Sequence, residues 1–195
     1  MKGSMGVTGH LQFQKSLPAN PHAKSAVILF ETKTWIPFAW SLFFVPEDLQ
    51  HFENEGTKSN LLVAPSRLAV SRARAHLKAL RKVAAKRLLA LLEHFVVSVE
   101  AAGEGFLVLD PYRLESGEDE LTQPLKWLAS LGDVDAEEWL ATGEELYSDD
   151  DEGLHWEGVR EDDEDEPELD YFEKDRVTGW PIAAKQVAWY EEDDE

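Results

Sequence analysis

Residues 65–100, PSRLAVSRARAHLKALRKVAAKRLLALLEHFVVSVE, contain no glycine or proline after Pro65. From Leu77 to Phe95, apolar residues recur at steps of three and four, which places them on one face of a helix. From Leu88 onward the stretch is apolar nearly all round, which is typical of a helix end that lies in a core. The pattern predicts one long helix over about residues 66–100, and we expect the rest of the chain to pack against it.

The same stretch carries eight of the nineteen lysine and arginine residues of the chain. Most of them fall off the apolar stripe, and together they define a predicted basic face. Its central members are Arg74, Lys78, Arg81 and Lys82. Three interpretations are open: contact with nucleic acid, contact with the acidic surface of a partner, and pairing with the protein's own acidic limb, which would hold the limb against the body. The formal charge of −20 opposes the first, because phosphates would meet a negative field.

Acidic residues concentrate at the C-terminal end. Residues 149–195 contain twenty acidic and four basic side chains, a net charge of −16, whereas residues 1–148 have a net charge of −4. Aromatic residues interrupt the acidic run, and a fully solvated segment rarely contains so many of them. The composition therefore predicts a core over residues 1–148 and an acidic limb over residues 149–195, which aromatic side chains anchor to the core as part of the same domain.

Short apolar runs predict strands at residues 6–14, 26–30 and 105–110. The third run, GFLVLD, is continuous rather than alternating, so we expect a central strand that is covered on both faces. Residues 53–60, ENEGTKSN, predict a polar loop. The fold class expected from these elements is α+β: a small, mostly antiparallel sheet packed on one long helix, with shorter helices and the acidic limb around it.

The aromatic-rich residues 34–52 predict a helix after Pro37 and a further helical turn at Pro46. Clustered aromatic side chains are usually buried, so a core helix is the first interpretation. A partner groove lined by Trp35 and Trp40 is the second. Two more helices are predicted at residues 121–131, with Pro124 in the opening turn, and at residues 135–147, with Asp135 as the N-terminal cap.

No sequence motif indicates a reaction. The chain has no cysteine, and the glycine-rich phosphate-binding, zinc-protease and serine-hydrolase motifs are all missing from the sequence. The six histidines lack metal-ligand spacing, so a structural role is expected for each. Asp110, at the end of the predicted central strand, is the one carboxylate where α/β proteins often place function, although capping before Pro111 explains it as well. We expect no catalysis, no cofactor and no metal site.

These observations predict a non-catalytic protein-binding module for a basic partner. In general character the chain resembles bacterial immunity and antitoxin proteins, which occlude a basic toxin such as a nuclease. The predicted partner-binding residues are Asp149, Asp150, Asp151, Trp156, Glu161, Asp162, Asp163, Glu164, Asp165, Glu166, Tyr171 and Phe172.

Two alternative functions stay open. One is a small enzyme with a pocket between residues 35–44 and Asp110. The other is a structural assembly subunit, which exposed tryptophan surface would signal. We see no signal peptide and no apolar stretch of spanning length, so no membrane contact and a cytoplasmic location are expected.

Overall fold

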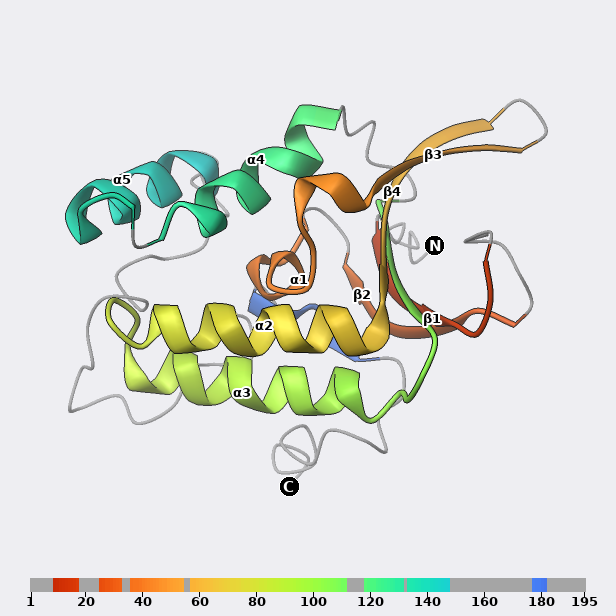
Figure 1. Ribbon diagram of the computed structural model, residues 1–195, viewed down its shortest axis with the longest axis horizontal. Helices are drawn as coiled ribbons and strands as arrows, with labels where there is room; N and C mark the ends of the chain where they lie inside the picture. The colour runs from red at the N-terminus through yellow and green to blue at the C-terminus, as the bar shows by residue number, and fades with distance from the viewer. Residues whose placement is uncertain are drawn as a thin grey trace, which may run out of the picture.

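The computed structural model describes residues 9–17, 25–32, 36–54, 57–111, 118–131, 133–147 and 177–181. Within these ranges, six strands form one antiparallel sheet in the order β3-β4-β5-β1-β2-β6 (Figure 1). The strands are β1 (Gly9–Gln14), β2 (Val27–Thr32), β3 (Leu49–Asn54), β4 (Thr57–Pro65), β5 (Phe106–Asp110) and β6 (Trp180–Pro181). The predicted antiparallel sheet is confirmed, and so is the α+β class.

The helices gather on one side of this sheet. They are α1 (Phe38–Ser41), the short 3-10 helix η1 (Pro46–Asp48), α2 (Ser66–Leu80), α3 (Lys86–Glu100), α4 (Glu118–Ala129) and α5 (Ala136–Tyr147). Figure 1 shows α2 and α3 side by side, with α1 between α2 and α4. Asp135 caps α5 as predicted, since its carboxylate accepts a hydrogen bond from the Glu137 amide at 2.8 Å. Pro124 lies inside α4 rather than in its opening turn, because the helix begins at Glu118.

The prediction of one long helix over residues 66–100 is wrong. The chain turns back between Leu80 and Lys86, where the amides of Val83 and Ala84 both bond to the Leu80 carbonyl. A continuous helix of this length would extend about 50 Å, beyond what one small sheet can cover. Two antiparallel helices instead bury both apolar faces, so tertiary packing overrides a local sequence that contains no helix breaker.

The predicted polar loop at residues 53–60 is also wrong. Residues 53, 54 and 57–60 belong to the arms of a β-hairpin whose register runs from Leu49 opposite Leu62 to Asn54 opposite Thr57. The hairpin extends away from the helices (Figure 1), so polar side chains can face solvent along it. The prediction for residues 105–110 is confirmed, because β5 lies between β4 and β1 and Leu107 to Asp110 are buried.

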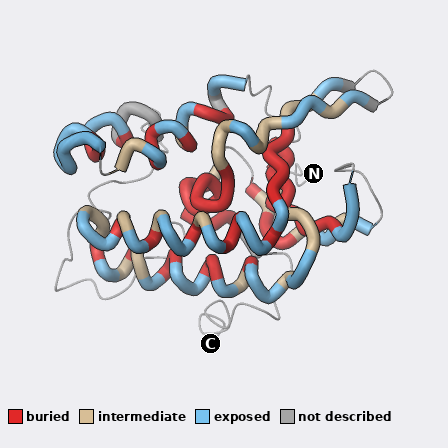
Figure 2. Tube along the Cα trace, in the orientation of Figure 1, coloured by how far each residue is buried: buried red, intermediate tan, exposed pale blue. Residues whose placement is uncertain are grey.

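The aromatic segment forms part of the core, as its first interpretation held. Phe38, Trp40, Phe43 and Phe44 are all buried. Figure 2 shows the α1 segment coloured as buried. The Phe43 ring meets Phe95 of α3 edge to face, with ring centroids 5.7 Å apart. A fully buried Trp40 cannot line a surface groove, so that part of the second interpretation is wrong. Trp35 lies outside the described residues.

A pair of tryptophans joins α4 to α5. The rings of Trp127 and Trp139 stack with centroids 4.1 Å apart and planes 13° from parallel. Each indole N–H donates to the other residue's carbonyl, at 2.7 Å from Trp127 and 2.9 Å from Trp139. Both residues are buried, and Phe38 packs edge to face on Trp127. The two helices are therefore fixed to each other and to α1.

Candidate functional site

The predicted partner-binding residues, from Asp149 to Phe172, lie outside the described residues. What the structure does describe of the predicted limb is its attachment to the body at residues 177–181. It also describes the whole of the predicted basic face, and the strand that ends at Asp110.

The attachment of the limb centres on Trp40. The Trp40 indole Nε1–H donates a 2.7 Å hydrogen bond to the Thr178 carbonyl, and both residues are fully buried. Val177 is buried beside them, in the main core. The chain then forms β6, which pairs with the outer edge of β2. The aromatic ring in this contact comes from the body, whereas the sequence predicted that aromatic rings of the limb would supply the anchors.

Gly179 is the residue that lets the segment fit. Its φ is +76°, a left-handed conformation that favours glycine. A Cβ atom at this position would lie 2.9 Å from the Glu31 carbonyl oxygen and 2.9 Å from Cζ2 of Trp40. The backbone of the limb therefore approaches β2 and Trp40 as closely as a residue without a side chain permits.

Much of the basic face is paired within the body. Arg74 Nη2 lies 2.6 Å from Glu100 Oε2, and Arg81 Nη2 lies 2.8 Å from Glu93 Oε1. Arg67 forms a third pair, with Glu104. Because α2 and α3 are antiparallel, the three pairs follow one another as a ladder between α2 and the segment from α3 to Glu104. Each rung is exposed, so the ladder contributes little to stability per pair.

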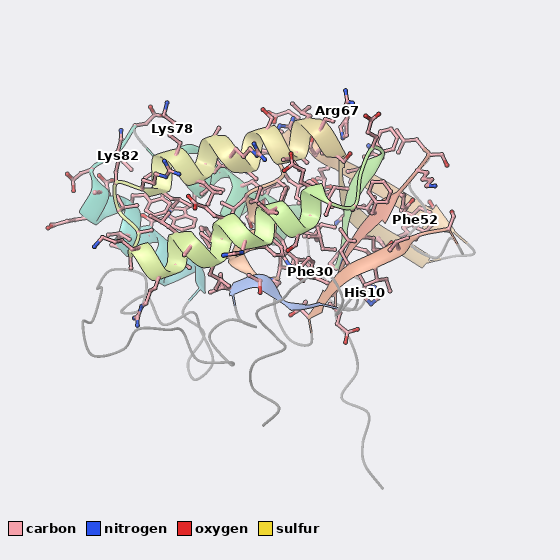
Figure 3. All side chains as sticks on the ribbon, turned by 90° about the horizontal axis from the view of Figure 1, so that it is seen from below. His10, Phe30, Phe52, Arg67, Lys78 and Lys82 are labelled. Atoms are coloured by element: carbon pink, nitrogen blue, oxygen red, sulfur yellow. The ribbon has the colours of Figure 1, made fainter. Side chains whose placement is uncertain are left out.

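The central residues of the basic face therefore differ: Arg74 and Arg81 form salt bridges, whereas Lys78 and Lys82 form none within the described ranges. Lys78, in the last turn of α2, and Lys82, in the turn that follows the helix, are both exposed (Figure 3). Neither forms a salt bridge with another residue in the described ranges. The described partners of the arginines belong to α3 and to the turn after it. The predicted pairing of the basic face with the acidic limb concerns carboxylates outside the described residues and stays a prediction.

A half-buried polar cluster, which the sequence did not indicate, joins η1 to α2. Arg72 Nη1 lies 2.6 Å from Asp48 Oδ2, and the same carboxylate accepts a 2.9 Å bond from the Val45 amide. One turn along α2, His76 Nδ1–H donates to the Leu42 carbonyl at 2.9 Å. The spacing of Arg72 and His76 predicts that they share a helix face. No sequence pattern predicts that Asp48 lies beside them.

Burial governs protonation in this cluster. It raises the pKa of Asp48, against the lowering effects of the Val45 amide and Arg72. It also lowers the pKa of His76, and the Arg72 charge lowers it further, against the Leu42 hydrogen bond. His76 is thus a neutral imidazole at pH 7 with a fixed tautomer, which agrees with the structural role expected of the histidines.

Asp110 is buried at the end of β5, where the register places it opposite His10 of β1. The aromatic residues within 36–44 are buried in the main core. Among the described ranges, no group of three histidine or acidic side chains is arranged to hold a metal ion.

Of the helices in the described ranges, none has the length and apolar character needed to cross a membrane. No protein-family model, no curated protein and no solved structure matches this chain.

Proposed function

We propose that this protein is a non-catalytic binding module that captures a basic protein partner through the acidic residues of its C-terminal limb. In this proposal it acts as immunity or antitoxin-type inhibitors do, by occluding a cationic surface such as that of a nuclease toxin. Closely spaced carboxylates steer a basic partner into contact and set the register of the complex. Aromatic residues among them supply the desolvated contacts that dominate binding energy.

The observation that carries the proposal is the salt-bridge ladder. Arg67, Arg74 and Arg81, the cations that an acidic limb would most easily recruit, already pair with carboxylates of the body. Because each of these arginines already faces a carboxylate of the body, it is a weaker counter-ion for the net charge of −16 in residues 149–195. Charge of this density repels itself unless cations from elsewhere compensate it.

The attachment at residues 177–181 supports the same proposal. The acidic stretch follows α5, which the Trp127–Trp139 pair fixes to the body, and precedes Val177, which is buried in the core. Both ends of the stretch are thus held. A segment that is held at both ends has fewer conformations to lose when a partner binds it.

The test compares two charge reversals of equal size. Asp162→Lys with Asp163→Lys changes the limb, and Asp119→Lys with Asp133→Lys makes the same change of net charge at exposed positions of the body. The immobilised protein first captures partners from lysate of the native host, and mass spectrometry identifies them. We expect a basic protein whose retention falls at least tenfold with the limb variant and less than twofold with the body variant. Equal loss with both variants would show that only net charge matters, and would refute the proposed site.

The two alternatives rest on less. The small enzyme retains one feature, the buried Asp110 opposite His10, whereas the described aromatic residues near it are buried in the core. For the structural assembly subunit, the expected sign is tryptophan surface that is exposed in the monomer. Trp40, Trp127 and Trp139, the tryptophans whose side chains are described, are all buried.

A further inference from the structure

Positive charge concentrates where α2 turns into α3. Residues 78–87, KALRKVAAKR, contain five lysine and arginine side chains and no acidic one, in a protein with a formal charge of −20. Lys78, Lys82 and Lys86 are exposed. Arg81 pairs with Glu93, whereas Lys78 and Lys82 form no salt bridge within the described ranges. This end of the helical hairpin is therefore a cationic surface, and we call residues 78–87 the basic turn.

Helix stability accounts for only part of this charge. Cations in the last turn of α2 are favourable, because the C-terminal end of a helix carries a partial negative charge. The first turn of α3 carries a partial positive charge, and Lys86 and Arg87 add to it. That turn contains no acidic residue, and the side chain of its N-cap residue, Ala85, cannot accept a hydrogen bond. An anionic group from outside α2 and α3 would therefore stabilise the basic turn.

The acidic limb starts from the same end of the molecule. Figures 1 and 3 both show α5 and the turn between α2 and α3 at one end of the long axis. The limb follows α5, which ends at Tyr147, and the chain is buried in the core again at Val177. An extended chain spans about 3.3–3.6 Å per residue, so residues 149–176 are long enough to pass over the basic turn between these two points.

Charge and tethering favour the limb over other acidic ligands. Residues 161–166, EDDEDE, are six consecutive acidic side chains. Both ends of the limb are attached to the body, so its effective concentration at the basic turn is of the order of millimolar. An acidic surface of another molecule would have to compete with that concentration. Nucleic acid would also meet the negative field of the limb.

We propose that the basic turn is a docking site for the protein's own acidic limb, with residues 161–166 against Lys78, Lys82 and the first turn of α3 when no partner is bound. Exposed ion pairs are individually weak, so this contact opens readily. A basic partner then displaces it, and the contact lowers the affinity of the limb for any other cationic surface. The docking stands without the proposed function, whereas the competition with a partner rests on it.

The experiment detects the docked limb with a spin label. The chain has no cysteine, so Gly158→Cys supplies a single attachment point within the limb. A nitroxide at this position broadens the NMR signals of nearby amides. The amides of Val83 and Ala84 bond to the Leu80 carbonyl and report on the basic turn. At low salt we expect these two signals to lose most of their intensity, and the Phe52 amide of the β3–β4 hairpin to keep its own.

Two charge reversals of equal size test the site. Lys78→Glu with Lys82→Glu changes the basic turn, and Lys15→Glu with Lys58→Glu makes the same change of net charge at exposed positions outside α2 and α3. An exposed ion pair shifts an equilibrium by up to about fivefold, and reversal replaces attraction by repulsion. We therefore expect the first variant to lower the docking equilibrium constant roughly tenfold and to restore the two signals.

The second variant should leave the broadening in place. Equal recovery of the signals in both variants would overturn the proposal. So would Val83 and Ala84 signals that the label does not broaden in the protein with its natural lysines. An acidic protein that is captured through Lys78 and Lys82 while the limb is undocked would assign the basic turn to another molecule, with the same consequence.

The same variants separate this inference from the proposed function. A limb that is released from the basic turn should retain a basic partner more strongly, so Lys78→Glu with Lys82→Glu should increase capture of that partner from host lysate. A limb that docks but captures no basic protein would contradict the proposed function alone. A limb that captures one without docking would contradict this inference alone.

Discussion

Gly179→Ala should release the C-terminal attachment without unfolding the body. The left-handed backbone costs an alanine about 1–2 kcal/mol, and the two contacts at 2.9 Å add an overpacking cost of about 1–3 kcal/mol. The interactions that hold residues 177–181 in place contribute a similar free energy. Burial of Val177 contributes about 1.5–3 kcal/mol, and the Trp40 hydrogen bond about 0.5–1.5 kcal/mol. We therefore expect residues 177–181 to detach rather than accommodate the methyl group, at a free-energy cost of about 2–4 kcal/mol.

The assay is hydrogen exchange of the Trp40 indole N–H, which is buried while the segment is in place. A loss of 2–4 kcal/mol accelerates this exchange by about thirtyfold to several hundredfold. Gly103→Ala is the matched control, because its φ is +95° but nothing lies within 4 Å of the added methyl group. We expect the control to lower the free energy of unfolding by about 1–2 kcal/mol and to leave Trp40 protected. Unchanged protection in Gly179→Ala would refute this account of the attachment.

Three further predictions concern the body. Trp139→Phe removes the donor to the buried Trp127 carbonyl and should lower the free energy of unfolding by about 1–3 kcal/mol in urea titrations; a change below about 0.5 kcal/mol would contradict the reciprocal bonding. A double-mutant cycle on Arg74 and Glu100 should give a coupling energy of about 0.2–1 kcal/mol that vanishes in 1 M salt. Arg72→Ala should lower the free energy of unfolding by about 2–4 kcal/mol, because it leaves the half-buried Asp48 carboxylate without its cation. Equal values at the two sites would contradict the difference in burial. Because burial lowers the pKa of His76, the stability linked to this residue is complete above the unfolded value of about 6.5 and is lost as the pH falls through the lower folded value; His76→Gln should remove that dependence in denaturation series between pH 5 and 7, and His94→Gln should not.

The central strand and the basic face could be predicted because each has a strong local pattern. The apolar run at residues 105–110 has no polar alternation, which only a strand covered on both faces permits. The helical period separates the basic residues of α2 from its buried stripe. The hairpin of β3 and β4 gave no such signal, because its outer part faces solvent and its polar side chains are typical of a loop. The turn between α2 and α3 was equally hidden, because no residue there disfavours a helix.

The sites depend on distant pairs that no local pattern specifies. Glu100 meets Arg74 only because the chain reverses between α2 and α3, and the predicted single helix would have kept them apart. His10 and Asp110 are opposite each other through a register that intervening turns and packing determine. The β6 strand has only two residues, too few for any periodicity. Trp180 could be read as an anchor, but the role of Gly179 depends on its conformation and its neighbours.

The Trp127–Trp139 pair has a spectroscopic consequence. Two indole rings that are 4.1 Å apart and nearly parallel couple their electronic transitions, so they contribute a circular-dichroism signal that separate rings would lack. That signal disappears when α4 and α5 come apart, whatever happens at the other five tryptophans of the chain. The protein thus carries an intrinsic optical probe of one helix–helix contact, and its loss can be timed against the release of the C-terminal strand.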